Sequence, residues 1–258
     1  MSLDLSGRVA LVTGAGRERG IGTATARLLA ERGAAVFFTY WHAFDRAQPW
    51  GAEPRHPERL LADLRDRGVP AEAMEIDLSR PEAPERLLDR VAETLGFPDI
   101  VVNNAAYSTA TDYAHLHAAA LDLHYAVNLR APALLSVLFA RQYQGGHGRI
   151  INLVTGSALA PMPGELAYSA TKGALETFTR DLSAGVAGKG ITVNAVQPGP
   201  TDTGWMTEEL RAAILGRSPS GRLGQPEDAA RLIAFLAGDE ACWITGQLIH
   251  SEGGWQRG

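Results

Sequence analysis

The sequence predicts a doubly wound α/β fold, in which helices cover both faces of a seven-stranded parallel sheet. Short apolar runs rich in β-branched residues alternate with longer amphipathic stretches, and a glycine-rich turn follows the first run. The length of 258 residues suits one domain of this kind. We therefore expect a single domain over residues 1–258. Alternating strands and helices form right-handed crossovers, which make the sheet parallel, so we expect ligands to bind beyond the carboxyl ends of the strands.

The expected elements follow this alternation along the chain. Strands are expected at the apolar runs 9–13, 35–39, 73–76, 100–103, 150–154, 191–196 and 247–249. Helices are expected where the intervening stretches have helical length and spacing, at 21–32, 57–67, 84–95, 125–143 and 168–187. Two segments rich in Pro and Gly, 41–57 and 198–224, are long for compact connections. We expect the second to form a substrate lid around residues 200–222.

Composition and charge narrow the class of protein. Hydrophobic residues make up 45% of the chain and charged residues 21%, as in a packed globular protein. The net charge of −5 argues against nucleic acid as a partner. The single cysteine, Cys242, excludes an intrachain disulfide and a Cys-based zinc site, which favours a cytoplasmic location. Apolar runs such as 232–238 are too short to span a bilayer and the N-terminus does not resemble a signal peptide, so we expect no membrane partner.

The turn after the first strand has the composition of a phosphate site. Glycines let the backbone approach a pyrophosphate at the positive N-terminus of the next helix, which is the Rossmann-type arrangement. The residues concerned are Gly14, Gly16, Gly20, Ile21 and Gly22. A plain tight turn is the alternative, and the position directly after the first strand favours the dinucleotide site.

The end of the second strand bears on the choice of dinucleotide. Tyr40 or Thr39 stands where an acidic residue would bind the adenosine ribose of NAD or of a methyl donor. A 2′-phosphate requires that carboxylate to be absent and cations to be nearby, and Arg17, Arg19 and His42 are available. The sequence therefore predicts NADP(H), and the alternative is that the arginines belong to a solvated turn.

Tyr168 and Lys172 form the sharpest local signal. They are four residues apart at the start of a predicted helix, so they share one face about 5–6 Å apart. We expect the ammonium to lower the pKa of the phenol from about 10 by about two units, which would let it exchange protons near neutral pH. An ordinary surface pair is the alternative; it is disfavoured because only two of the 24 basic residues are lysines.

Two further polar residues are candidates for the same site. Thr155 follows the fifth strand, where its hydroxyl can bond a substrate carbonyl, and Ser157 is a second candidate. Either hydroxyl can equally belong to a turn or a helix cap. Asn128 lies inside a predicted helix, where Asn is a poor helix former, and is expected to hold a water for proton relay. The alternative for Asn128 is an exposed or kink-forming amide.

Other motifs are missing or incomplete. The chain has no Gly-x-Ser-x-Gly elbow of an α/β-hydrolase and no P-loop. His115, His117 and His124 lack the carboxylates that would accompany them in a metal site, so we expect no metal and place all three on a solvated helix surface.

Taken in order, these motifs resemble those of the short-chain dehydrogenase/reductase family in its single-domain branch, most of all its 3-oxoacyl-carrier-protein reductases. The resemblance covers the whole chain and rests on Thr13-Gly14…Gly20-Ile-Gly22, Asp77-Leu78, Asn103-Asn-Ala-Ala106, Asn128, Thr155, Tyr168…Lys172 and Pro198-Gly199-Pro-Thr201-Asp-Thr203. It implies that Tyr168 is the general acid/base, that Lys172 holds the nicotinamide ribose, and that Thr155 orients the carbonyl.

The resemblance also implies cofactor contacts outside the glycine turn. Asp77 and Leu78 would line the adenine, Asn104, Ala105 and Ala106 the nicotinamide ribose, and Pro198, Gly199, Thr201 and Thr203 the nicotinamide. The chain departs from the family pattern in three ways: a glycine loop longer by two residues, Ala106 in place of Gly, and Thr155 in place of Ser.

By the same resemblance, the expected function is reduction of a ketone by NADPH in a homotetramer built through helices 125–143 and 168–187 and the last strand. The substrate pocket is expected to be mainly apolar, which suits a hydrophobic or 3-oxoacyl ketone, and to be lined by Tyr107, Ser157, Met162, Trp205 and Met206. Whether the substrate is bound to a carrier protein stays open, since one of the two basic docking positions is Gly146 and only Lys189 remains.

The alternative from another class is a non-catalytic NADP(H)-binding sensor or scaffold. Enoyl reductases of the family space Tyr and Lys more widely, and dehydratases and epimerases have a longer C-terminal domain.

Overall fold

The computed structural model describes residues 4–156 and 161–255, and a parallel sheet of seven strands runs through it. The strands are β1 (Val9–Val12), β2 (Ala35–Tyr40), β3 (Ala71–Glu75), β4 (Ile100–Asn103), β5 (Arg149–Leu153), β6 (Thr192–Gln197) and β7 (Leu248–His250). Their order in the sheet is β3-β2-β1-β4-β5-β6-β7. The order in which the strands are added therefore reverses between β1 and β4, which creates the switch point where doubly wound folds bind ligands. The predicted fold class is confirmed, and every strand lies within two residues of its expected bounds.

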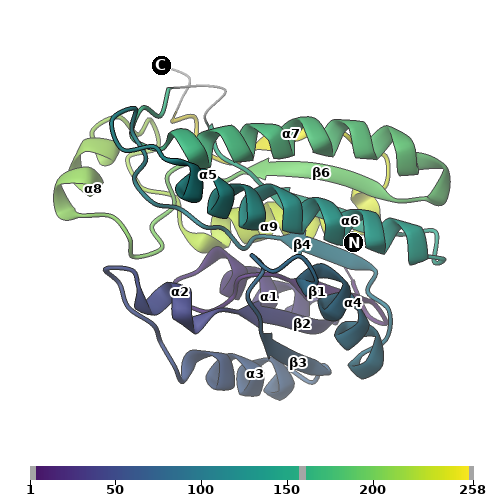
Figure 1. Cartoon of the computed structure of the whole chain (residues 1–258). Helices are drawn as coiled ribbons and strands as arrows, with labels where there is room; N and C mark the ends of the chain where they lie inside the picture. The colour runs from purple at the N-terminus through teal and green to yellow at the C-terminus, as the bar shows by residue number, and fades with distance from the viewer. Residues whose placement is uncertain (1–3, 157–160, 256–258) are drawn as a thin grey trace.

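Helices cover both faces of the sheet (Figure 1). One face carries α1 (Ile21–Glu31), α3 (His56–Asp66) and α9 (Pro226–Ala237), and the other carries α4 (Ala83–Thr94), α6 (Ala131–Gln142) and α7 (Leu166–Val186). Successive side chains of a strand point to opposite faces, so Ala10 and Val12 enter the first core and Leu11 enters the second. The near-continuous apolar strands are explained by this two-sided burial.

The helix expected at 125–143 starts seven residues earlier and contains an irregular turn. It consists of α5 (Ala118–Tyr125), a π-helical turn (Ala126–Arg130) and α6. Pro132 has no N–H to donate to the carbonyl of Asn128, and its ring would clash with that carbonyl in a regular α-helix. The chain accommodates the proline by widening the turn before it.

By length and composition alone, the combined helix Ala118–Gln142 is apolar enough to cross a membrane, with a mean hydropathy of 1.2. Half of its most apolar stretch is buried in this fold. Core helices of globular proteins have the same property, so the feature is weak evidence for a membrane span.

The two long segments each contain a short helix. These are α2 (His42–Arg46) and α8 (Glu208–Leu215), and the hydroxyl of Thr207 caps α8 by accepting from the Leu210 amide at 3.2 Å. Figure 1 shows both helices at the edge where the strands end. Both segments therefore lie where a ligand of this fold would bind.

Candidate active site

The turn between β1 and α1 requires glycine at two positions, Gly14 and Gly22. Gly14 has a φ of +76°, and a Cβ there would lie 2.7 Å from the Cα of Ala105. A Cβ on Gly22 would lie 2.4 Å from the carbonyl oxygen of Gly14. The side chain of Asn104 holds the turn by donating to the carbonyls of Thr13 and Gly14 at 2.8 and 2.9 Å. The glycines let this turn lie close to the N-terminus of α1, which is where doubly wound folds bind the pyrophosphate of a dinucleotide.

Each charged residue of the lengthened glycine loop binds a different part of the fold. Arg17 donates to the carbonyl oxygen of Thr203 at 3.2 Å, and its guanidinium lies 4.6 Å from the ring centre of Trp50. Glu18 accepts from Arg27 at 2.5 Å. Arg19 forms an ion pair with Asp202 at 2.7 Å. The extra residues thus join the cofactor turn to the segment of α2, to α1 and to the expected lid.

The cations expected at the adenosine end have carboxylate partners. Nδ1 of His42 lies 3.5 Å from Glu75, and Nε of Arg17 lies 3.8 Å from Asp45. Asp45 is buried, with one oxygen 3.0 Å from where a Cβ of Gly16 would stand, and burial raises the pKa of its carboxyl. Burial also lowers the pKa of Arg17. Sequence reasoning missed Asp45, which lies five residues beyond the strand end where an acidic residue was sought.

Tyr168 and Lys172 lie in the first two turns of α7, as their spacing predicts. Lys172 is 1% exposed, and its ammonium donates to the carbonyl of Leu153 at 2.6 Å and lies 5.8 Å from the ring centre of Tyr168. Burial lowers the pKa of Lys172 to about 8. The link to Leu153 joins α7 to the end of β5, where Thr155 follows.

The expected lowering of the Tyr168 pKa is wrong for this structure. Burial raises the pKa of the Tyr168 phenol, and the charge of Glu165 raises it further. Lys172 does not offset this desolvation, because burial disfavours its own charged form and its hydrogen bond goes to a main-chain carbonyl. The phenol therefore keeps its proton at neutral pH in this environment.

The neighbouring candidates occupy distinct places. Thr155 is half-buried, with its hydroxyl 3.5 Å from the sulfur of Met162, and Ser157 lies outside the described residues. Asn128 is fully buried in the π-helical turn. Its side chain exchanges hydrogen bonds with both main-chain groups of Tyr107, each at 2.8 Å, and donates to Thr171 at 3.3 Å. The amide is thus fully engaged by protein groups, and Pro132 supplies no N–H to the main-chain carbonyl of Asn128.

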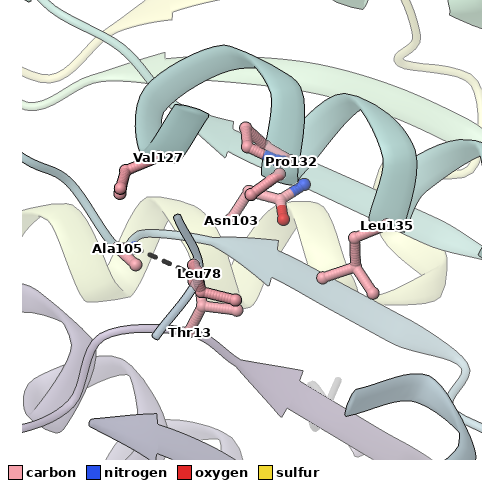
Figure 2. A pocket seen from close by; sticks show the side chains of 8 residues that line it. Thr13, Leu78, Asn103, Ala105, Val127, Pro132 and Leu135 are labelled. Carbon is pink, nitrogen blue, oxygen red and sulfur yellow. Dashed lines mark hydrogen bonds between the residues drawn. The ribbon is translucent and has the colours of Figure 1, made fainter. Parts of the chain in front are cut away.

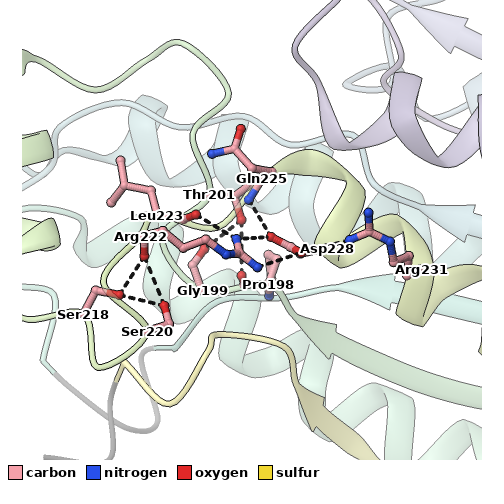
Figure 3. Close-up of polar contacts among 10 residues, drawn as sticks. All are labelled: Pro198, Gly199, Thr201, Ser218, Ser220, Arg222, Leu223, Gln225, Asp228 and Arg231. Carbon is pink, nitrogen blue, oxygen red and sulfur yellow. Dashed lines mark hydrogen bonds and ion pairs between the residues drawn. The ribbon is translucent and has the colours of Figure 1, made fainter.

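The residues after β6 form a tight turn that leads into the expected lid. Gly199 has a φ of +66°, and a Cβ there would lie 2.5 Å from Glu252. The hydroxyl of Thr201 donates to the carbonyl of Pro198 at 3.2 Å, and the indole of Trp205 donates to the carbonyl of Thr201 at 3.3 Å. Figure 3 shows this turn beside the pair of Arg222 and Asp228, which closes the far end of the lid at the start of α9.

Of the two adenine-side candidates, Leu78 borders a small cavity and Asp77 does not. Asp77 accepts from the Ser79 amide at 2.9 Å, which fixes the turn after β3. The cavity, drawn in Figure 2, has a volume of about 10 Å³, close to that of one water, and is lined by Thr13, Leu78, Asn103, Ala105, Val127, Ala131, Pro132 and Leu135. It lies between the end of β4 and the π-helical turn. Ala106 and Tyr107 continue from this edge and are half-buried.

The histidines do not all lie where the sequence placed them. His115 and His117 are exposed, as expected, but His124 is fully buried, so its predicted surface position is wrong. Its two ring nitrogens find main-chain partners, which makes burial possible for a neutral imidazole. Among residues 4–156 and 161–255, no three His, Cys, Asp or Glu side chains gather in a way that could hold a metal ion.

A glycine turn shaped for pyrophosphate, at the same sheet edge as a protonated phenol and a buried ammonium, defines the class of dinucleotide-dependent oxidoreductases. Comparisons with known proteins make the assignment more specific. The family model described as enoyl-(acyl carrier protein) reductase matches residues 14–256. YjdA, an uncharacterized oxidoreductase of Bacillus subtilis (strain 168), is 51% identical over 254 residues, covering 97% of this chain and 98% of its own.

Two further relatives carry more descriptive names. The 3-oxoacyl-[acyl-carrier-protein] reductase FabG of Vibrio cholerae is 36% identical and is matched over 98% of both chains. The crystal structure of a blue fluorescent protein from a metagenomic library, in complex with NADPH, has a TM-score of 0.88 at 31% identity and covers 98% of this chain and 99% of its own. The chain belongs to the short-chain dehydrogenase/reductase family and is an oxidoreductase that uses a nicotinamide cofactor and acts on CH–OH or C=O groups.

Proposed function

We propose that this enzyme is an NADPH-dependent ketoreductase and alcohol dehydrogenase with Tyr168 as its general acid/base. The observation that carries the proposal is the pairing, at the start of one helix, of the Tyr168 phenol with the buried ammonium of Lys172, which lies 5.8 Å from the centre of the tyrosine ring. A non-catalytic sensor or scaffold would not need this pair. An enoyl substrate is not proposed, because Tyr168 and Lys172 are only four residues apart.

The residues have separate roles in the proposed reaction. The nicotinamide, when bound, supplies or takes up the hydride. Tyr168 donates its phenolic proton to the oxygen of the ketone as that oxygen gains negative charge, and takes a proton back in the reverse direction. The hydroxyl of Thr155 donates a second hydrogen bond to the same oxygen. Lys172 holds the nicotinamide ribose and stabilises the phenolate that remains after proton transfer.

The proposed cofactor site follows the sheet edge from β2 to β6. Gly14, Gly16, Arg17, Arg19, Gly20, Ile21, Gly22, Tyr40, Asp77 and Leu78 are assigned to the phosphates and adenosine, and Asn104, Ala105, Ala106, Pro198, Gly199, Thr201 and Thr203 to the nicotinamide side. Preference for NADP(H) is supported by Tyr40 at the end of β2, by Arg17 in the glycine loop, and by the similarity to a protein solved with NADPH.

The proposed substrate is a hydrophobic or 3-oxoacyl-type ketone. Its pocket is assigned to Tyr107, Ser157, Met162, Trp205 and Met206, with residues 200–222 as the lid. The apolar character of these side chains and the similarity to a 3-oxoacyl-[acyl-carrier-protein] reductase support this substrate class.

The proposed assembly is a homotetramer in the cytoplasm. Apolar side chains remain exposed along the combined helix of α5 and α6 and just before it, as a buried subunit contact requires: Leu116, Leu121, Leu123, Tyr125 and Leu134. The single cysteine agrees with a reducing compartment. Light scattering that showed a monomer at micromolar concentration would rule out this assembly.

The function is tested by titrating NADPH and NADH by fluorescence, then following absorbance at the nicotinamide band with ketones from acetoacetyl thioesters to bulky cyclic ketones. Tighter binding of NADPH with turnover of a ketone supports the proposal and gives the size class of the substrate. Binding of either cofactor without turnover across the panel favours the sensor or scaffold. Binding of neither means that the lengthened glycine loop does not hold a dinucleotide.

A further inference from the structure

His124 is a buried side chain of α5 that the proposed reaction does not use. Its relative exposure is 0%, and it stands opposite the loop that follows β4. Nδ1 lies 2.7 Å from the carbonyl oxygen of Ala120, one turn back along the helix, and the amide of Thr109 donates to Nε2 at 3.3 Å. The ring also meets that of Tyr107 edge to face, with 4.8 Å between centres. A histidine buried with this set of contacts has a defined orientation.

The two hydrogen bonds also define where the ring proton lies. A carbonyl oxygen only accepts, so Nδ1 must carry the proton that it shares with Ala120. A main-chain amide only donates, so Nε2 must offer a lone pair to Thr109. His124 is therefore a neutral imidazole with its proton on Nδ1, and it acts as a hydrogen-bond acceptor for the loop.

The loop of residues 107–111 is held at two points by neighbouring turns of one helix. Asn128, four residues after His124, binds both main-chain groups of Tyr107 at 2.8 Å. His124 binds the amide of Thr109. A main-chain segment fixed at two alternate residues has little freedom. Thr111 lies only two residues beyond the second anchor, so these bonds limit its freedom as well.

Thr111 in turn supplies the cap of α7. The first N–H groups of a helix have no partner within the helix. The amide of Leu166 donates to the carbonyl of Thr111 at 2.9 Å, and the amide of Ala167 donates to its hydroxyl at 3.1 Å. The amide of Thr111 donates to the carbonyl of Gly164 at 2.8 Å. Tyr168 follows directly after Ala167, so the loop fixes the turn from which the phenol projects.

We propose that His124 is a positioning residue for the reaction: as a neutral acceptor it fixes the loop of residues 107–111 and, through Thr111, the first turn of α7 that carries Tyr168. The proposal rests on the proposed role of Tyr168 as acid/base. It assigns to His124 a function that depends on one lone pair and not on the bulk of the ring.

Two substitutions of His124 separate the lone pair from the packing. His124→Asn keeps an amide nitrogen near the position of Nδ1, where it can donate to Ala120, and removes the acceptor for Thr109. His124→Gln places an amide oxygen near the position of Nε2 and keeps that acceptor. We expect His124→Asn to lower kcat about 10-fold with the KM for NADPH changed less than about twofold, and His124→Gln to retain more than about a third of kcat. Equal kcat values for the two variants would overturn the proposal.

Amide hydrogen exchange on the full chain gives a second readout that needs no substrate. In His124→Asn, exchange should accelerate at Thr109 and also at Leu166 and Ala167, and in His124→Gln it should stay near the wild-type rate. Acceleration confined to Thr109 would show that the loop does not hold α7. Because Tyr168→Phe tests the acid/base directly, a failure of the proposed reaction is distinguishable from a failure of this coupling.

Discussion

The carboxylate of Asp202, at the start of the proposed lid, lies 2.7 Å from the guanidinium of Arg19 in the glycine loop. The same side chain is 4% exposed and also binds Arg211 of α8 at 2.6 Å. Asp202 therefore joins the glycine turn to residues 200–222 by charge. If these residues act as a lid, its opening would require the contact between Asp202 and Arg19 to break.

Replacing Asp202 by Asn should speed the release of NADPH. The neutral amide weakens both ion pairs, although the exposure of Arg19 limits the contribution of its pair. We expect the dissociation rate, measured by stopped-flow fluorescence, to rise about fivefold. Arg211→Gln is the control, because it removes only the contact between Asp202 and α8. If Arg211→Gln alone raised the dissociation rate as much as Asp202→Asn, the ion pair with Arg19 would not contribute to NADPH retention.

Tyr168→Phe should abolish turnover and leave cofactor binding intact. The phenylalanine keeps the ring but has no proton to donate, so we expect kcat to fall about 1,000-fold or more, with the Kd for NADPH within about twofold of wild type. The measurements are steady-state turnover and fluorescence titration. Retention of more than about a tenth of the activity would contradict the assignment of Tyr168.

The buried Lys172 should make the stability of the cofactor-free enzyme depend on pH. Its pKa is about 8 in the folded chain and 10.5 as the ordinary value, so the unfolded state binds more protons between these limits. The free energy of unfolding should therefore rise between pH 8 and pH 10, by up to about 3 kcal/mol, and the full cost of the buried charge should be present below pH 8. Denaturant unfolding of wild type and Lys172→Met isolates this contribution, and parallel pH curves for the two proteins would refute it.

Gly22→Ala should damage the cofactor turn. Its Cβ would lie 2.4 Å from the carbonyl oxygen of Gly14 and 2.7 Å from the amide nitrogen of Asn104, so the turn must shift. We expect a loss of about 1–3 kcal/mol of stability and weaker binding of both cofactors. Gly185→Ala in α7 is a matched control, since its Cβ meets nothing within 4 Å in the described part of the chain, and should gain about 0.5–1 kcal/mol.

Arg17 and Asp45 should affect the choice of cofactor in opposite directions. Arg17→Ala removes a cation from the adenosine end, so we expect the Kd for NADPH to rise about 10-fold and that for NADH to change less than about threefold. Asp45→Asn removes the carboxylate beside Gly16 and should tighten NADPH binding relative to NADH. Fluorescence titration of both cofactors against both variants gives the answer; a shift of the same sign in both variants would exclude this account.

The five inner strands were predictable because they are buried on both faces, which gives each of them a clear apolar run. The Tyr168–Lys172 pair was equally visible, since a four-residue spacing is a local property of a helix. The sign of the Tyr168 pKa shift was not, because it depends on how deeply the phenol is desolvated by segments distant in sequence.

The position of His124 and the role of Asp45 could not be predicted either, because both depend on contacts between segments that are distant in sequence. Burial of His124 requires two main-chain partners, one of them in a different element, and no pattern around the residue announces them. Asp45 reaches the cofactor turn only because α2 folds back against it. The π-helical turn did leave a signal, Pro132 within an otherwise helical stretch, which physical reasoning about the missing N–H could have used.

That widened turn acts as a phase shift along the helix. Each residue of an α-helix rotates the following side chains by roughly 100°, so an added residue turns the face of α6 relative to that of α5. His124 can thereby point at one loop while Leu135 and Phe139 point into the core beside α4. A single-residue deletion between 126 and 130 would remove the extra residue and misalign one of these two faces, so this stretch is sensitive to any change of its length.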